Sequence, residues 1–101
     1  MLDIRYGEDH HVLLVGRLDA AQAAMAQAFL DAVPPPCVID AGGLEYISSA
    51  GLGVLLKTHK RLVAAGAGIR LVNVNLHVYD VFRYSGMDKL FSVTVGTAAN
   101  G

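Results

Sequence analysis

The sequence lacks several features that would point to particular classes of protein. Its charges nearly balance, with eight Lys and Arg against nine Asp and Glu, and the cations are scattered rather than gathered into a stripe. A nucleic-acid-binding surface is therefore not indicated, because such surfaces concentrate cations along the phosphates. No apolar run reaches the roughly 18 residues of a membrane-spanning helix, and no basic segment followed by an apolar core opens the chain. Neither membrane insertion nor secretion is expected.

Cysteine and metal-binding spacings are scarce as well. Cys37 is the only cysteine, so no disulfide can form within the chain, and it lies in an apolar run. This suits a protein of a reducing compartment such as the cytoplasm, with the thiol acting as a small buried hydrophobe. We expect no metal and no cofactor, because no metal-ligand spacing such as H-E-x-x-H relates the four histidines, His10, His11, His59 and His77.

Motifs for catalysis are also missing. Neither Ser48 nor Ser49 has a glycine both two positions before and two positions after it, as a hydrolase nucleophile elbow requires. No phosphate-binding glycine motif follows a strand, and the Gly42–Gly43 pair is more typical of a tight turn. No spacing indicates that any two of three acidic residues converge into a catalytic pair: Asp19, Asp40 and Glu45. We therefore expect no intrinsic enzymatic activity.

The chain does contain the apolar content of one compact domain. Its 101 residues are 53% apolar and 17% charged, which favours burial over disorder. We expect one domain over residues 1–96 and a short flexible tail over 97–101. Leu2–Tyr6 and His11–Val15, separated by the turn-forming Gly7–Asp9, predict an antiparallel hairpin.

The following segment predicts a first helix over Ala20–Val33. Asp19 is placed to cap this helix, with Gln22 as the answering half of a capping box. Pro34–Pro36 ends the helix because proline lacks the amide hydrogen. The core-facing residues expected on this helix recur every fourth position: Met25, Phe29 and Val33.

Strands and helices alternate over the rest of the chain. Cys37–Asp40 predicts a central strand, and a second helix is expected from Ala50 or Gly51 to about Ala65, with Gly66 as its C-cap. The apolar stripe of this helix comprises Leu52, Leu55, Leu56, His59, Leu62 and Val63.

A third helix should follow the strand Gly68–Val74. Asn75 can cap this helix, which ends at Ser85–Gly86, and a last strand is expected over Leu90–Val95. Its inward residues are Val78, Val81 and Phe82. The order β-β-α-β-α-β-α-β predicts a single α/β domain with a mixed, mainly parallel sheet.

The segment Asp40–Gly53 is the most unusual part of the sequence. We expect it to be a loop that leaves the carboxyl end of a central strand and enters the second helix, where open α/β sheets bind ligands. Ser48 and Ser49 stand where an N-cap belongs, and the amides of a first helical turn tolerate a phosphate. Local sequence leaves open whether one serine simply caps the helix and the other is merely exposed.

A family resemblance bears on these serines. Leu44–Leu56 resembles the signature of STAS domains, in which an apolar pair, a small polar pair, a small residue and Gly-Leu open the second helix. Val15–Asp19 resembles the strand-ending Gly-x-Leu-Asp of the family. Val81–Phe82, Ser85–Met87 and Leu90–Phe91 resemble its third helix and exit, so the resemblance covers nearly the whole chain.

The resemblance implies a role as an anti-sigma-factor antagonist. In such proteins the serine two positions before the Gly-Leu of the signature is phosphorylated, and here that residue is Ser49. Many phosphorylated members have an aspartate immediately before this serine, whereas this chain has Ser48, which becomes a second candidate. The implied partner-binding residues are Asp19, Asp40, Ser48, Ser49, Ala50, Gly51, Leu52 and Gly53.

The implied mechanism is partner switching. The unmodified protein would bind an anti-sigma factor of the histidine-kinase-like ATPase type and free the sigma factor. Phosphorylation by that serine kinase would end the complex, and a serine phosphatase would reset it. The alternative is a constitutive, non-phosphorylated STAS subunit of a larger assembly, such as a transport complex or a signalling scaffold, and the absence of the usual aspartate keeps this alternative open.

Overall fold

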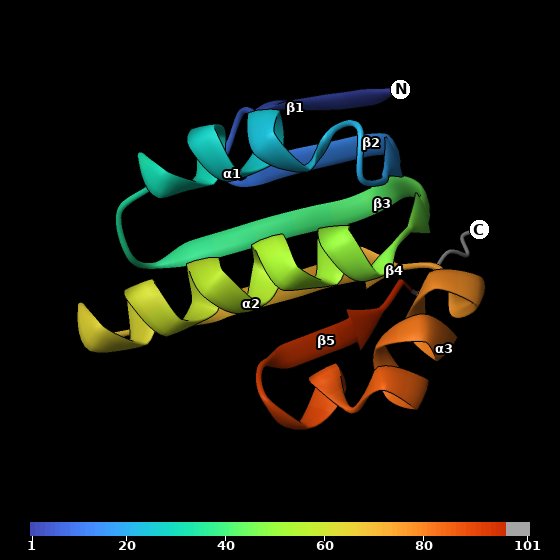
Figure 1. Cartoon of the computed structure of the whole chain (residues 1–101). Helices are drawn as coiled ribbons and strands as arrows, with labels where there is room; N and C mark the ends of the chain where they lie inside the picture. The colour runs from blue at the N-terminus through green and yellow to red at the C-terminus, as the bar shows by residue number, and fades with distance from the viewer. Residues whose placement is uncertain (97–101) are drawn as a thin grey trace.

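The computed structural model describes residues 1–96, so the tail predicted over 97–101 lies outside the described residues. One sheet contains five strands in sequence order (Figure 1), with β1 antiparallel to β2 and the remaining neighbours parallel. The strands are β1 Leu2–Tyr6, β2 Val12–Leu18, β3 Cys37–Ile47, β4 Ile69–Val74 and β5 Ser92–Val95. This arrangement confirms the predicted mixed α/β fold and the predicted order of its elements.

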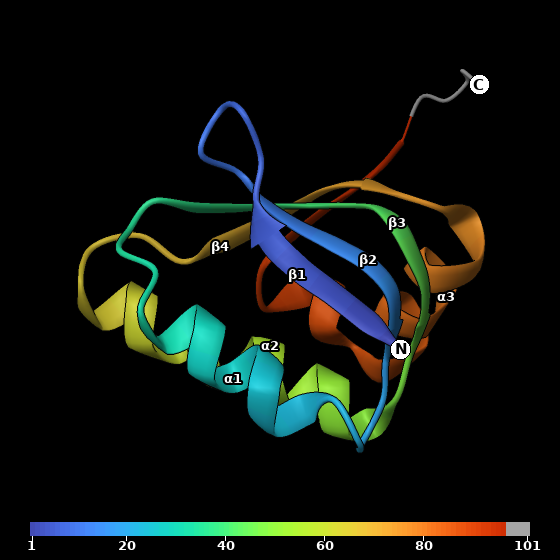
Figure 2. The ribbon, with the colours of Figure 1, turned by 90° about the horizontal axis from the view of Figure 1, so that it is seen from above.

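Three α-helices cover one face of the sheet (Figure 2). They are α1 Ala23–Asp31, α2 Ser49–Ala64 and α3 Leu76–Ser85, and a short 3-10 helix η1, Met87–Lys89, follows α3. The core lies between the helices and the sheet, where Leu14, Ile39 and Leu71 are fully buried against the helical layer. Side chains on the opposite sheet face, such as Val15, Arg17 and Arg70, remain exposed.

Cys37 is buried at the start of β3, as the sequence predicts. Burial raises the pKa of its thiol to about 11, and the nearby Arg61 guanidinium only partly opposes this rise. The thiol is therefore protonated at neutral pH and is not an activated nucleophile.

The prediction for the first helix was wrong in its start, in its cap and in one of its three core-facing residues, Met25. Asp19 does not cap α1: its carbonyl accepts the Gln22 amide in a preceding turn, and Gln22 becomes an N-cap whose side chain makes no capping bond. The buried residues of α1 are Ala26 and Leu30, and Met25 is 44% exposed, whereas Phe29 packs against the core and Val33, just after the helix, is buried as predicted. Because alanine occupies so much of this segment, its apolar pattern does not fix which side of the helix faces the core.

The expected loop at Asp40 was also wrong, because β3 continues to Ile47. The second half of β3 pairs with β2 in parallel register, with Gly43 beside Val15 and Ile47 beside Leu18. Gly43 does not form a tight turn. A Cβ atom there would lie 3.0 Å from a methyl group of Val15, so the glycine lets the neighbouring side chain lie over the strand.

The second helix follows its predicted bounds closely. It begins at Ser49, one or two residues earlier than expected, and Gly66, with φ of +125°, follows its end. Leu52, Leu55 and Leu62 are buried as predicted, but Val63 is 54% exposed, because the inward side of this helix instead includes Val54 and Thr58.

The carboxyl-terminal half of α2 is held by polar side chains. Arg61 donates from Nη2 to the carbonyl oxygens of Leu30 (2.8 Å) and Val33 (2.7 Å), at the end of α1. His59 lies at the rim of the core, as predicted, and its Nδ1 accepts from the amide of Ile69 at 3.2 Å. These bonds tie α2 both to α1 and to the start of β4.

The third helix confirms its predicted caps. The Asn75 Oδ1 atom accepts from the Val78 amide at 2.8 Å, and the Asn75 Nδ2 atom donates to the Leu44 carbonyl at 2.9 Å. Gly86 ends the helix with φ of +79°, a conformation that glycine adopts readily. Val78 and Phe82 are fully buried, and Val81 is partly buried.

Candidate functional site

Ser48 is the N-cap of α2. Its backbone is extended, its Oγ accepts from the Gly51 amide at 3.2 Å, and its carbonyl accepts from the Leu52 amide at 2.9 Å. The Ser48 amide donates to the Leu18 carbonyl at 3.0 Å, so the helix start is fixed to the end of β2. The Ser48 hydroxyl oxygen is therefore committed to the helix start.

Ser49, by contrast, is exposed as the first residue of α2. Within residues 1–96 its hydroxyl makes no side-chain hydrogen bond. The hydroxyl lies at the positive end of the helix, where amide hydrogens of the first turn favour an anion. Its position makes Ser49 the more accessible of the two serines.

Gly51 allows the helix to approach β2 closely. A Cβ atom at this position would lie 2.7 Å from the Leu18 carbonyl oxygen and 2.8 Å from the Ile47 side chain. Asp19 directly follows Leu18, so it lies at the same corner of the molecule as Ser48. One oxygen of the Asp19 carboxylate, Oδ1, is buried and has no hydrogen-bond partner among the described residues. We call Asp19, Ser48 and Ser49 the serine corner.

Asp40 does not join the serine corner. It lies within β3, seven residues before Ile47, which corresponds to roughly 20 Å along an extended strand. Its Oδ1 accepts from the Gly42 amide at 2.9 Å and its Oδ2 from the Asn73 side chain at 3.2 Å. The structure therefore brings Asp19 to the serines but leaves Asp40 on the open face of the sheet.

The residues that follow Ser49 divide between core and surface. Gly51 and Leu52 are buried, while Ala50 and Gly53 line a hollow of about 460 Å³ between α1 and α2. Sequence reasoning missed the other residues of this hollow, although the i, i+3, i+7 spacing of Ala50, Gly53 and Lys57 places them on one helix face. The missed residues are Ala23, Ala24, Gln27, Val54 and Lys57.

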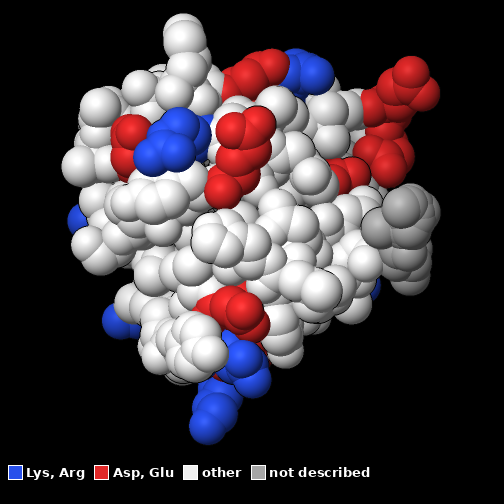
Figure 3. All heavy atoms as spheres, turned by 90° about the vertical axis from the view of Figure 1, so that its right-hand side faces the viewer, with Lys and Arg blue, Asp and Glu red and all other residues white. Residues whose placement is uncertain are grey.

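Figure 3 views the molecule from the side at which β3 ends, where acidic and basic side chains lie beside one another in small groups with uncharged surface between the groups. No extended patch of either charge covers this side. A partner next to this corner would meet charged as well as uncharged groups, including Arg17, whose guanidinium lies over the Tyr46 ring.

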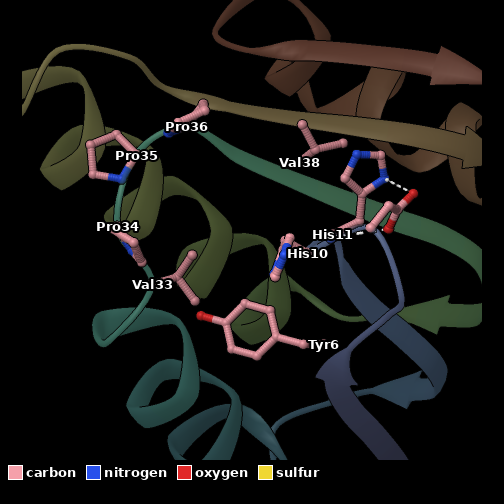
Figure 4. Close-up of a pocket in the computed structure, with 9 residues that line it drawn as sticks. Tyr6, His10, His11, Val33, Pro34, Pro35, Pro36 and Val38 are labelled. Carbon is pink, nitrogen blue, oxygen red and sulfur yellow. Dashed lines mark hydrogen bonds and ion pairs between the residues drawn. The ribbon is translucent and has the colours of Figure 1, made fainter.

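A second hollow, of about 510 Å³, lies at the opposite end of the sheet. Tyr6, His10 and His11 line it together with Pro34–Pro36 (Figure 4). The His11 Nδ1 atom lies 3.1 Å from a carboxylate oxygen of Asp9, so one nitrogen of this imidazole already has a polar neighbour within the protein. Within residues 1–96 no three His, Cys, Asp or Glu side chains gather where they could hold a metal ion.

A family model described as "Mlab, STAS domain" matches residues 4–94. The chain belongs to the STAS domain family. Among curated proteins, this STAS domain is 37% identical to BtrV of Bordetella bronchiseptica over 84 residues, which cover 79% of this chain and 72% of that protein. BtrV is named as an anti-sigma factor antagonist.

Solved structures share the fold. An anti-sigma factor antagonist from Mycobacterium paratuberculosis matches with a TM-score of 0.74 and 24% identity, over 93% of this chain and 84% of that chain. SpoIIAA of Bacillus in its phosphorylated form matches with a TM-score of 0.64 and 21% identity, over 98% and 96%. In the part of this STAS domain that the structure describes, no helix is both long and apolar enough to cross a bilayer.

Proposed function

We propose that this STAS domain is a cytoplasmic anti-sigma-factor antagonist, which acts by binding rather than by catalysis. Its binding surface would comprise the serine corner and the neighbouring hollow between α1 and α2. The exposed position of Ser49 at the start of α2 carries this proposal. The similarity to BtrV, a named anti-sigma factor antagonist, supports it.

The proposed partner is an anti-sigma factor of the histidine-kinase-like ATPase type that phosphorylates Ser49. A phosphoryl group adds nearly two negative charges at neutral pH, and Asp19 already places a carboxylate at this corner. The added charge and bulk would be costly to bury in a tight interface, while the helix start tolerates the phosphoryl group in the free domain. Phosphorylation would thus end the complex without unfolding the domain, and a serine phosphatase would restore binding.

Ser48 is the less suitable phosphoacceptor. Its Oγ accepts the Gly51 amide, and a phosphoryl group on that oxygen would disturb the helix cap. The phosphorylated form of the structurally similar SpoIIAA supports a phosphoacceptor somewhere in this fold, and the accessible hydroxyl here belongs to Ser49.

Calorimetric titration of Ser49→Asp against the candidate kinase tests the switch. We expect affinity to fall about 100-fold or more, because a charge placed in a tight interface disrupts its central contacts. The melting temperature should change little, since Ser49 is exposed. Ser92→Asp on β5 is the matched control, because Ser92 is also an exposed serine but lies on the edge strand near the carboxyl-terminal half of α2, away from the serine corner, and it should bind like the wild type.

Intact-mass spectrometry after incubation with ATP and the kinase identifies the modified residue. We expect one phosphoryl group on Ser49, and none on the Ser49→Ala variant. Equal binding by the wild type and Ser49→Asp would contradict the switching mechanism.

The second candidate function is a constitutive subunit of a larger assembly. The observation that favours it is Ser48, which replaces the usual aspartate and is used to cap α2. A folded protein that no candidate kinase phosphorylates, and whose Ser49→Asp variant still enters the assembly, would support this function instead.

A further inference from the structure

The outer edge of β1 is uncovered. β1 is the first strand of the sheet, and within residues 1–96 no helix or strand lies beyond it (Figure 1). The Met1 carbonyl accepts from the Arg17 amide at 2.9 Å, and the Gly7 amide donates to the His11 carbonyl at 2.7 Å. Because backbone direction alternates along a strand, odd-numbered residues of β1 bond to β2. The backbone groups of Leu2, Ile4 and Tyr6 therefore point outward.

This edge has few of the usual protections against pairing. Natural edge strands are often interrupted by proline or a bulge, or carry lysine. The five residues of β1 include neither proline nor lysine, their pairing with β2 is continuous from Leu2 to Tyr6, and the two charged residues, Asp3 and Arg5, are of opposite sign. The strand thus offers a regular row of free amides and carbonyls.

Apolar surface flanks the same edge on the helical side of the sheet. The Tyr6 ring is 48% exposed, and its centroid lies 5.3 Å from that of Phe29 on α1. Met25, one turn before Phe29, is 44% exposed. Tyr6 and Met25 would both lose contact with water if the helices of a second copy of this domain lay beside α1.

We propose that β1 pairs antiparallel with β1 of a second copy of this chain, about a two-fold axis at Ile4. In this register Ile4 lies opposite Ile4 of the second copy, and Leu2 lies opposite its Tyr6. Every outward backbone group of β1 then has a partner, and the two sheets become continuous with their helices on the same face.

Charge fixes this register. Asp3 and Arg5 project from the same side of β1 and already form an ion pair within the strand. In the proposed register Asp3 faces Arg5 of the second copy on both sides of the axis. A slip of the second copy by two residues would instead place Asp3 opposite Asp3, or Arg5 opposite Arg5, and like charges directly opposite are unfavourable. Of these three registers, only the one centred on Ile4 places opposite charges across from one another.

Analytical ultracentrifugation over a range of concentrations tests the proposal. The wild type should approach twice the 10.7 kDa mass of one chain. The charge reversals Asp3→Arg and Arg5→Asp should each raise the dimer dissociation constant about tenfold or more, because each places like charges opposite one another. Mixing these two variants should restore the dimer, since every cross-strand pair is again of opposite charge.

Arg70→Asp is the matched control, because Arg70 is an exposed arginine on the interior strand β4 and its reversal should leave the dimer intact. A wild type that stays monomeric at its highest soluble concentration would overturn the proposal. The proposal would also be overturned if Asp3→Arg or Arg5→Asp alone formed dimers at the same concentration as the wild type. Failure of the mixture of the two variants to dimerise would overturn it too. The test requires neither the kinase nor ATP, so its outcome is separate from that of the proposed switch.

Discussion

The two halves of α2 differ in how their polar side chains are used. In the carboxyl-terminal half, Thr58, His59 and Arg61 all bond to other parts of the protein: Thr58 accepts from Gln27 on α1, His59 accepts from the β4 amide, and Arg61 donates to two carbonyls. In the first turn, Ser48 caps the helix and Ser49 faces solvent. Polar side chains thus hold the carboxyl-terminal half of α2 to α1 and β4, whereas at the start of the helix the Ser48 backbone holds it to β2 and the Ser49 side chain is exposed.

This difference suggests how the domain can bind a partner without losing its fold. Charge or contacts can change at Ser49 while the bonds of Arg61 hold the same helix against α1. Surface substitutions without special contacts change stability little, whereas the loss of buried polar partners is costly. The two halves should therefore respond differently to substitution.

The largest expected effect on stability is in the carboxyl-terminal half of α2. Arg61→Ala should lower the free energy of unfolding by about 3 kcal/mol, because it removes hydrogen bonds from a charged donor to two partly buried carbonyls. Urea denaturation followed by circular dichroism measures the change. Lys60→Ala, which removes an exposed neighbouring cation, should stay within about 0.5 kcal/mol of the wild type. Equal losses in both variants would remove the distinction between the halves.

A smaller effect on stability is expected in the first turn of α2, where the helix contacts β2. Gly51→Ala should cost about 2 kcal/mol, because its Cβ atom would press on the Leu18 carbonyl. Gly53→Ala is the control: no atom lies within 4 Å of its added Cβ, so the alanine should stabilise the helix by about 0.5 kcal/mol or more. Thermal unfolding of the two variants compares these glycines directly, and a stabilised Gly51→Ala would contradict the close approach.

The smallest effects separate the two serines. Ser48→Ala should cost about 1 kcal/mol through loss of the cap to Gly51, whereas Ser49→Ala should change stability by less than about 0.5 kcal/mol. Denaturant titration of both variants under the same conditions checks this. A larger loss for Ser49→Ala would mean that its hydroxyl supports the fold, and the proposed division between the serines would be wrong.

The sequence predicted elements best where a single residue type has a local mechanical role. Asn75 caps α3 and Gly86 ends it, and both act through hydrogen bonds or backbone angles within a few residues. The start of α2 was likewise placed within a residue or two, because Ser48 and Ser49 are strong N-cap candidates.

The errors arise where the local structure depends on contacts with segments that are distant in the sequence. Gly43 belongs to a strand only because β2 lies beside it, and Met25 is exposed although Phe29, one turn later on α1, packs against the core. Asp40 was expected near the serines because β3 was expected to end there, and the longer strand separates them. That Lys57 and residues of α1 line one hollow could not be predicted, because it depends on how α1 packs on α2.

The Asn75 side chain makes two hydrogen bonds of opposite polarity, one to each of two elements. Its oxygen accepts at the start of α3 and its nitrogen donates to the carbonyl of Leu44 on β3. Deamidation, the slow hydrolysis by which asparagine ages to aspartate, would preserve the acceptor and replace the donor with a second oxygen. That oxygen would face the Leu44 carbonyl, so the cap would survive while the link between α3 and the sheet would turn from attraction to repulsion. Deamidation of Asn75 should therefore weaken the attachment of α3 to the sheet while leaving the helix cap in place.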